Sequence, residues 1–340
     1  MNAIIVGVGS IGLNHLDFLI DRYGSCAVVD TSSAALLRAK EKFGRKVEVF
    51  GTIEEAVRSL YQPEHVTAVI ANLGPDHLET AMKLINVGIK KIYLEKPMAT
   101  SIDDCARLID ISKISDTRVV IGFQRRGSGL AGAVNTLAEK YGIGKPTSIL
   151  VHGGALDMST TGIHWLDFAT EIFQGAPISV LGAGSRAAIN PRSPELFFWD
   201  GSITWEFKLG QRLTQVFDNR SSLSSEVVVY CRDGIIRVGD GYLELGIRDK
   251  GEIEKFPQIT RCGAVSDSWR VSNFALELKD GREELFRRLE GTEDIHSSLV
   301  ESAKVTSALW AGLWSLENGK SVDLPVSRSH ESYFVKWRAS

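Results

Sequence analysis

The chain has 340 residues, of which 44% are hydrophobic and 24% are charged, and these fractions exclude a disordered or fibrous protein. Its 39 basic and 42 acidic side chains give a formal net charge of −3, which argues against a nucleic-acid partner. No apolar run reaches the ~18 residues of a membrane span, and the first residues lack the basic start of a signal peptide. The four cysteines form no metal-binding pattern. We therefore expect a cytoplasmic protein of two domains, with no metal, membrane or nucleic acid bound.

Strands and helices alternate through the first 122 residues. Apolar runs rich in β-branched residues predict strands over 2–8, 26–30, 46–50, 66–71, 91–94 and 119–122. The periodicity between them predicts helices over 10–23, 34–43, 53–60, 77–87 and 102–114. Parallel strands joined by helices build a doubly wound sheet with right-handed crossovers, so the pattern predicts an α/β domain over residues 1–122.

The second half of the chain is richer in strands. Asp-Gly pairs predict tight hairpins within a mostly antiparallel sheet at 200–201, 233–234 and 240–241. Helices are expected over 130–141, 268–289 and 295–317. These elements predict an α+β domain over residues 123–340 with a large open sheet. We expect one face of this sheet to pack on helices and the other to carry Trp199, Trp205 and Phe207, covered by a second subunit.

A glycine-rich motif opens the first helix. Gly7, Gly9 and Gly12 give the pattern G-x-G-x-x-G directly after a buried strand, which is typical of a dinucleotide-binding turn. Gly7 permits the tight turn, Gly9 lets a pyrophosphate approach the backbone, and Gly12 lets the helix close on the strand. The helix N-terminus, with Ser10 and Ile11, supplies amide donors for the phosphates.

An acidic residue follows this motif at the expected spacing. Asp30 ends the second strand about 20 residues later, where an acid binds the adenosine ribose diol. Its carboxylate repels a 2′-phosphate, and the next two residues, Thr31 and Ser32, supply no arginine. The motif therefore predicts NAD as the cofactor, in preference to NADP.

Further polar residues lie where a parallel sheet binds its ligands. Lys96 follows the fifth strand and the stretch 72–77 follows the fourth, so both face the crevice at the carboxyl ends of the strands. A lysine there can place a positive charge and an exchangeable proton beside a substrate carbinol. His164 and Asp167 lie three residues apart on one face of an expected helix. A single histidine in such a position is more often structural than catalytic.

The order of these motifs resembles the glucose–fructose oxidoreductase, inositol dehydrogenase and MocA family over nearly the whole chain. Besides the glycine motif and Asp30, the resemblance rests on N-x-x-P-x-H at 72–77, E-K-P at 95–97, G-F-Q-R-R at 122–126 and G-I-H-x-x-D at 162–167. It implies a Rossmann domain followed by a domain whose open sheet builds homodimers or homotetramers. It also implies NAD(P)-dependent hydride transfer at a hydroxyl or keto carbon of a sugar, cyclitol or nucleotide sugar.

The resemblance also implies roles for individual residues, with Lys96 and His164 as the catalytic pair. The cofactor contacts expected beyond the glycine motif and Asp30 are Asn72, Pro75, His77, Glu95, Lys96 and Gln124. The substrate contacts expected are Lys96, Arg125, Thr160, His164 and Asp167. Arg125 or Arg126 either binds an anionic group of the substrate or forms a surface ion pair.

One position departs from the family pattern. Many members have an aspartate four residues before the histidine, whereas this chain has Thr160 there and Asp157 seven residues before His164. Either Thr160 or Asp157 takes the place of that aspartate. If no carboxylate pairs with His164, its pKa is expected near the ordinary histidine value of about 6.5.

These residues predict an NAD-dependent dehydrogenase in which His164 is the general base and Lys96 polarises the reacting oxygen. Two alternatives remain. A redox-neutral enzyme would use tightly held NAD for a transient oxidation that supports elimination or glycoside cleavage. A non-catalytic NAD(H) sensor would keep only the nucleotide site. Thr160 favours the sensor, whereas the presence of both Lys96 and His164 opposes it.

Overall fold

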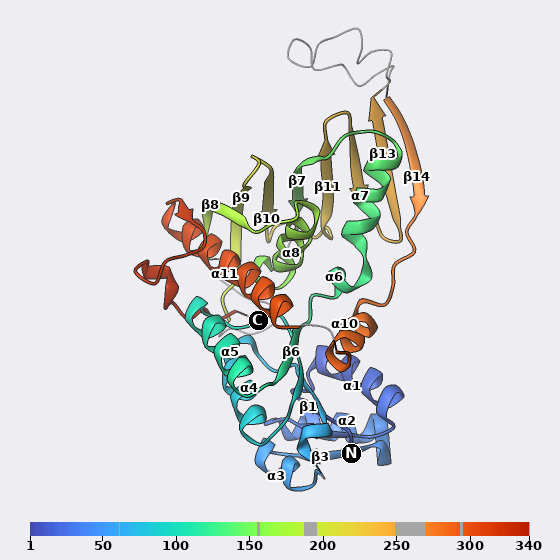
Figure 1. Cartoon of the computed structure of the whole chain (residues 1–340), viewed down its shortest axis with the longest axis vertical. Helices are drawn as coiled ribbons and strands as arrows, with labels where there is room; N and C mark the ends of the chain where they lie inside the picture. The colour runs from blue at the N-terminus through green and yellow to red at the C-terminus, as the bar shows by residue number, and fades with distance from the viewer. Residues whose placement is uncertain (61, 155–156, 187–195, 249–268, 293–294, 340) are drawn as a thin grey trace.

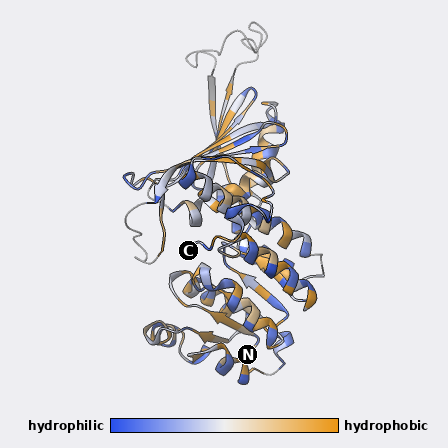
Figure 2. Ribbon diagram, turned by 90° about the vertical axis from the view of Figure 1, so that its left-hand side faces the viewer, coloured by the Kyte–Doolittle hydropathy of each residue, from blue (hydrophilic) through white to orange (hydrophobic). Residues whose placement is uncertain are grey.

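Two sheets lie at opposite ends of the protein, and helices fill the space between them (Figures 1 and 2). The computed structural model describes the chain except for residues 61, 155–156, 187–195, 249–268, 293–294 and 340. Within that part of the chain, no helix is long and apolar enough to cross a membrane.

The first sheet has the strand order β3-β2-β1-β4-β5-β6, and all of its pairings are parallel. Its strands are β1 (Ala3–Val6), β2 (Cys26–Val29), β3 (Val47–Phe50), β4 (Thr67–Ile70), β5 (Lys91–Leu94) and β6 (Arg118–Ile121). The helices between them are α1 (Ser10–Tyr23), α2 (Ser33–Phe43), α3 (Ile53–Arg58), α4 (His77–Asn86) and α5 (Ile102–Ile114). This arrangement confirms the predicted doubly wound sheet. Its central strands are buried along their whole length, as expected where helices cover both faces.

The second sheet has the strand order β14-β13-β12-β11-β7-β10-β9-β8-β15. Every pairing is antiparallel except that of β7 with β10, which confirms a mostly antiparallel sheet. Its strands are β7 (Pro146–His152), β8 (Pro177–Arg186), β9 (Trp199–Phe207), β10 (Arg212–Phe217), β11 (Glu226–Cys231), β12 (Gly234–Val238), β13 (Tyr242–Arg248), β14 (Trp269–Ala275) and β15 (Val322–Asp323). The accompanying helices are α6 (Gln124–Ser128), α7 (Leu130–Lys140), α8 (Ile163–Ile172), α10 (Gly281–Glu290) and α11 (His296–Asn318).

The large aromatic residues of β9 lie on the helix-covered face of this sheet, which corrects the expectation that they face a second subunit. Trp199 and Trp205 are fully buried, and Phe207 is nearly so. The helix α11 packs on β8 and β9, and the indole nitrogen of Trp205 donates to the carbonyl of Ala308. The alternation along the strand correctly placed these aromatic residues on one face of the sheet, but it could not show which face the helix covers.

Two other predictions about the second sheet are wrong. The pair Asp200-Gly201 lies inside β9 instead of forming a hairpin, since the apolar alternation of the strand continues through it. Gly201 allows close contact with Gly184 of β8, whose Cα lies 2.7 Å from the position a Cβ at Gly201 would take. The helix expected over 268–289 is divided into β14 and α10, and Asp280 caps the start of α10.

Segments from the second half of the chain also pack against the first sheet. The ring of Phe286 on α10 stacks on Tyr93 of β5 at 5.1 Å, and Arg118 of β6 donates to the carbonyl of Leu289. Near the C-terminus, the amide of Trp337 donates to the carbonyl of Thr100. The burial of the first sheet therefore depends on residues from outside the segment 1–122.

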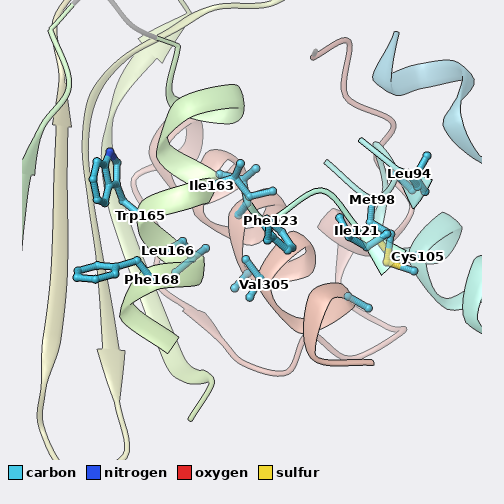
Figure 3. Packing of buried hydrophobic residues seen from close by; sticks show 14 of the residues in the cluster. Leu94, Met98, Cys105, Ile121, Phe123, Ile163, Trp165, Leu166, Phe168 and Val305 are labelled. Atoms are coloured by element: carbon cyan, nitrogen blue, oxygen red, sulfur yellow. The ribbon is translucent and has the colours of Figure 1, made fainter. Parts of the chain in front are cut away.

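A continuous core joins the two sheets beside α8. Figure 3 shows Phe123, which follows β6, next to Ile163 of α8 and Val305 of α11, whereas Trp165 and Phe168 point toward the strands of the second sheet. The side chain of Gln215, buried on β10, donates to the carbonyl of Gly162 at 2.8 Å. These contacts fix the start of α8 above the carboxyl end of the first sheet.

Candidate active site

A cavity of about 420 Å³ lies where the carboxyl ends of β5 and β6 meet the start of α8. Both halves of the chain contribute to it. Its lining residues are Ile11, Glu95, Lys96, Gly122, Gln124, Arg125, Thr160, Thr161 and His164. The structure therefore brings together both predicted catalytic residues and most of the predicted substrate contacts.

Lys96 enters this cavity from the end of β5. Its ammonium Nζ donates to the carbonyl oxygen of Thr160 at 3.3 Å. The peptide bond between Lys96 and Pro97 is cis. The hydrogen bond to Thr160 places the ammonium group beside the turn that leads into α8.

His164 lies in the first turn of α8, with its ring edge-on to Phe123 at 6.3 Å between centroids. Its Nδ1 is enclosed and has no hydrogen-bond partner in the described structure. Burial, together with the charges of Lys96 and Arg125, holds the pKa of His164 well below the ordinary value of 6.5. The expectation of a pKa near 6.5 is therefore corrected, and the imidazole is neutral and able to accept a proton at neutral pH.

The predicted alternatives to the family aspartate have different positions. Thr160 lines the cavity, whereas Asp157 caps the π-helical turn Met158–Gly162 that precedes α8. The Asp157 carboxylate accepts hydrogen bonds from the backbone amide of Thr160 at 3.0 Å and from the hydroxyl of Ser159. Asp157 therefore shapes the turn, and it is Thr160 that lies at the cavity.

Glu95 is held by a residue that the sequence pattern did not indicate. Its carboxylate pairs with the buried ring of His15 on α1 at 2.7 Å and accepts the backbone amide of Lys96 at 3.2 Å. Burial alone would raise the pKa of Glu95, but the hydrogen bond from His15 and the charges of His15 and Lys96 bring it below its ordinary value. The carboxylate is thus fixed at the side of the cavity nearest to the glycine-rich turn.

The two neighbouring arginines have different environments. Arg126 forms an ion pair with Asp167, whose side chain is almost completely buried. The Arg125 guanidinium lies over the indole of Trp165 at 4.1 Å and lines the cavity. Asp167 does not reach the cavity, so its predicted role as a substrate contact has no support in the geometry.

A second cavity, of about 360 Å³, lies across the ends of β1, β2 and β4. It contains Gly7, Asp30 and Asn72, which were predicted to contact the cofactor. The Asp30 carboxylate accepts the backbone amides of Val8 and Ser32, each at 2.8 Å. A carboxylate oxygen accepts more than one hydrogen bond, so both oxygens retain capacity for a ribose diol.

The glycine-rich turn between the two cavities fits a pyrophosphate. Gly9 precedes α1 and provides no side-chain cap, so the first amides of the helix stay available to an anion. A Cβ at Gly9 would meet nothing within 4 Å, whereas one at Gly12 would lie 2.0 Å from the carbonyl oxygen of Gly7. The open space at Gly9 is consistent with its predicted role of letting a pyrophosphate approach. The close contact at Gly12 is consistent with its predicted role of letting the helix approach the strand.

Apart from residues of the glycine-rich turn, two predicted cofactor residues, Pro75 and His77, lie outside both cavities. Pro75 is exposed in a short helical turn. His77 is buried, and its ring nitrogens lie 2.7 Å from the carbonyl oxygen of Pro97 and 3.2 Å from that of Asn72. His77 therefore links the loops after β4 and β5 without facing a ligand. No cluster of His, Cys, Asp or Glu in the described residues could hold a metal ion.

Residues 1–123 match the model of an oxidoreductase family with an NAD-binding Rossmann fold. The inositol 2-dehydrogenase of Salmonella paratyphi B is 27% identical over 165 residues, which cover 47% of this chain and 47% of that protein. An inositol 2-dehydrogenase/D-chiro-inositol 3-dehydrogenase of Shouchella clausii is 26% identical over 151 residues, 43% of this chain and 42% of that protein. The chain thus matches less than half the length of these relatives.

Solved structures share the fold over almost the whole chain. An oxidoreductase of Thermotoga maritima has a TM-score of 0.73 at 16% identity, with 94% of this chain and 97% of that one covered. An oxidoreductase of Agrobacterium radiobacter, solved with NAD⁺, L-tartaric acid and magnesium, has a TM-score of 0.72 at 17% identity, with the same coverage of 94% and 97%. Residues 1–123 thus match the glucose–fructose oxidoreductase, inositol dehydrogenase and MocA family of oxidoreductases, and the whole chain shares its fold with these solved oxidoreductases.

Proposed function

We propose that the protein is an NAD-dependent dehydrogenase that transfers a hydride between nicotinamide and the hydroxyl-bearing carbon of a sugar or cyclitol. The observation that carries this proposal is that Lys96 and His164, from the two halves of the chain, line one cavity. Glu95 and Ile11 lie in the same cavity and connect it to the glycine-rich turn. The inositol 2-dehydrogenases among the relatives support the substrate class.

The chain's own residues manage the proton in this reaction. Bound nicotinamide would supply the acceptor for the hydride that leaves the carbinol carbon. Since Nδ1 of His164 is enclosed, Nε2 is the nitrogen that takes the hydroxyl proton. Lys96 places its positive charge at the same oxygen and stabilises the negative charge that develops there. The alcohol thus loses one hydride and one proton and becomes a carbonyl.

The charges around Asp30 favour NAD over NADP. The cavity that contains Asp30 is also lined by Glu54, Asp76 and Glu79. Among the described residues that line it, Lys83 is the one cation, and it forms an ion pair with Glu79 at 2.9 Å. A 2′-phosphate in this cavity would be repelled by the surrounding carboxylates.

The open face of the second sheet supports a homo-oligomer. Leu150 and Leu181 lie on this face, opposite to the one covered by α11, and their side chains are 38% and 53% exposed. Tyr230 lies on the same face and is 40% exposed. We propose that a second copy of the chain covers these residues in a homodimer or homotetramer.

Incubation of the purified protein with NAD and a panel of sugars, cyclitols and nucleotide sugars tests the proposed activity. We expect NADH to accumulate to many molecules per protein molecule with at least one member of the panel. Oxidation limited to one tightly held NAD per protein would instead indicate a redox-neutral enzyme. Binding of NAD without any oxidation would indicate a sensor.

A further inference from the structure

The charges that line the proposed substrate cavity do not balance. Lys96 and Arg125 each contribute a positive charge to it, whereas the imidazole of His164 is neutral. Glu95 is the only acidic residue among its described lining residues, so one carboxylate faces two positive charges. The cavity therefore carries an excess of positive charge.

Arg125 is the clearest source of this excess. Its guanidinium carbon lies over Trp165, 4.1 Å from the ring centroid, and in the described part of the chain the guanidinium makes no hydrogen bond to a carboxylate. The adjacent Arg126 shows the alternative, because its charge is matched by Asp167. Burial lowers the pKa of Arg125 to about 10, although the negative charge of Asp167 acts to raise it. A half-buried cation that faces a cavity without a matching anion is suited to an anionic ligand.

We infer that the substrate carries a carboxylate that binds to Arg125, so that the substrate class is a polyhydroxy acid, such as a uronate or an aldonate. This inference rests on the proposed function, because it concerns the same cavity. The planar guanidinium can donate two parallel hydrogen bonds to a carboxylate. The contact with the indole of Trp165 helps to position the guanidinium. The carboxylate is bound and is not changed by the reaction.

A carboxylate fits this cavity better than a phosphate. A phosphate dianion carries up to two negative charges, whereas Arg125 supplies one positive charge and Lys96 is already assigned to the reacting oxygen. The cavity volume of about 420 Å³ also suits one sugar-sized acid. That volume is near the lower end of the range of about 300–1,000 Å³ for small-molecule sites. A nucleotide sugar would extend beyond it.

Binding of a carboxylate also changes the environment of His164. The positive charges of Lys96 and Arg125 both lower the pKa of His164. A carboxylate on Arg125 offsets one of these charges, so the pKa of His164 rises when the substrate is in place. The imidazole then accepts the hydroxyl proton more readily in the complex than in the free protein.

The test compares matched acidic and neutral ligands in the presence of NAD. The acids are D-glucuronate, D-galacturonate and D-gluconate, their neutral counterparts are D-glucose, D-galactose and D-glucitol, and D-glucose 6-phosphate represents a phosphate. Binding is measured by calorimetry and by the fluorescence change of Trp165, judged against Trp165→Phe. NADH formation is followed separately. The variants are Arg125→Gln, Arg125→Lys and, as a surface control, Arg107→Gln, because Arg107 is half-exposed and does not line the cavity.

We expect at least one acid to bind at least about 10-fold more tightly than its neutral counterpart, because hydrogen bonds to charged groups contribute that much. Arg125→Gln should remove this preference and leave neutral ligands unaffected. Arg125→Lys should restore only part of it, since lysine lacks the planar fork. The affinities of Arg107→Gln for the acidic and neutral ligands should equal those of the unaltered protein.

The two proposals can fail separately. Arg125-dependent binding of an acid without NADH formation would support the carboxylate site and contradict the dehydrogenase. NADH formation from neutral ligands that Arg125→Gln leaves unchanged would support the dehydrogenase and overturn the carboxylate site. Tighter Arg125-dependent binding of the phosphate than of every acid would also overturn it. Failure of all ligands to bind in the presence of NAD would overturn both.

Discussion

The ammonium group of Lys96 donates to the carbonyl oxygen of Thr160 at 3.3 Å, and this contact joins the end of β5 to the turn before α8. Because β5 belongs to the first sheet and α8 packs under the second, the contact lies at the junction of the two halves. A ligand that reaches Lys96 therefore also meets Thr160 and His164. This geometry determines how each residue is expected to respond to substitution.

The pH dependence of turnover should reflect the low pKa of His164. Since Lys96, Arg125 and burial lower this pKa, the free protein keeps a neutral imidazole below pH 6.5, and the acidic limb of kcat/KM should lie below that value. Thr160→Asp adds a carboxylate near the ring, which raises the pKa of His164 and should move the acidic limb upward. Thr160→Ser serves as the matched control and should leave the limb in place. An unchanged limb in Thr160→Asp would show that His164 is not the titrating base.

The preference for NAD should depend on Asp30. Asp30→Ser removes the carboxylate that we propose binds the ribose and also the hydrogen bond acceptor of the Val8 amide, so the affinity for NAD should fall. The affinity for NADP should rise relative to NAD, because a charge that repels the 2′-phosphate is removed. Calorimetry with both dinucleotides measures the ratio. A native protein that binds NADP more tightly than NAD would contradict the account of this cavity.

The ion pair between Arg126 and Asp167 should stabilise the fold without contacting substrate. Asp167→Asn leaves the Arg126 guanidinium without its partner in a mostly buried position. Removal of one member of a buried pair typically destabilises a protein by about 3–5 kcal/mol. Urea unfolding should show this loss, while the KM of the folded variant stays close to that of the native protein. A large change in KM with unchanged stability would make Asp167 a substrate contact after all.

The open face of the second sheet should mediate self-association. Light scattering should report a mass that is two or four times the chain mass of 37.3 kDa. Leu150→Lys introduces charge among the exposed apolar residues of this face and should shift the protein toward the monomer. Leu209→Lys is a suitable control, since Leu209 is highly exposed in the turn between β9 and β10. A native monomer at micromolar concentration would exclude the proposed interface.

The first sheet was predictable because its signals are local. Each strand is a short apolar run, and the glycine motif is fixed by sterics that only glycine satisfies, as the 2.0 Å approach of a Cβ at Gly12 shows. The cavity around Lys96 and His164 was also indicated, because residues at the carboxyl ends of parallel strands meet at one edge.

Other features depend on contacts between distant segments. His15 pairs with Glu95 across 80 positions of sequence, and Gln215 reaches Gly162 across 53, so no local pattern reveals either contact. The burial of Trp205 depends on where α11 packs, which the alternation along β9 does not encode. The pair Asp200-Gly201 has the composition of a turn, but close packing against β8 keeps it within a strand.

The most direct test of the proposed activity is the yield of NADH per protein molecule for the native protein and for Lys96→Met, with Lys42→Met as a control on the protein surface. The best substrate from the panel and saturating NAD are used, and NAD affinity is measured in parallel. We expect many turnovers from the native protein and from Lys42→Met, and a loss of at least about 10²-fold for Lys96→Met at unchanged NAD affinity. Equal yields from the native protein and Lys96→Met would contradict this expectation.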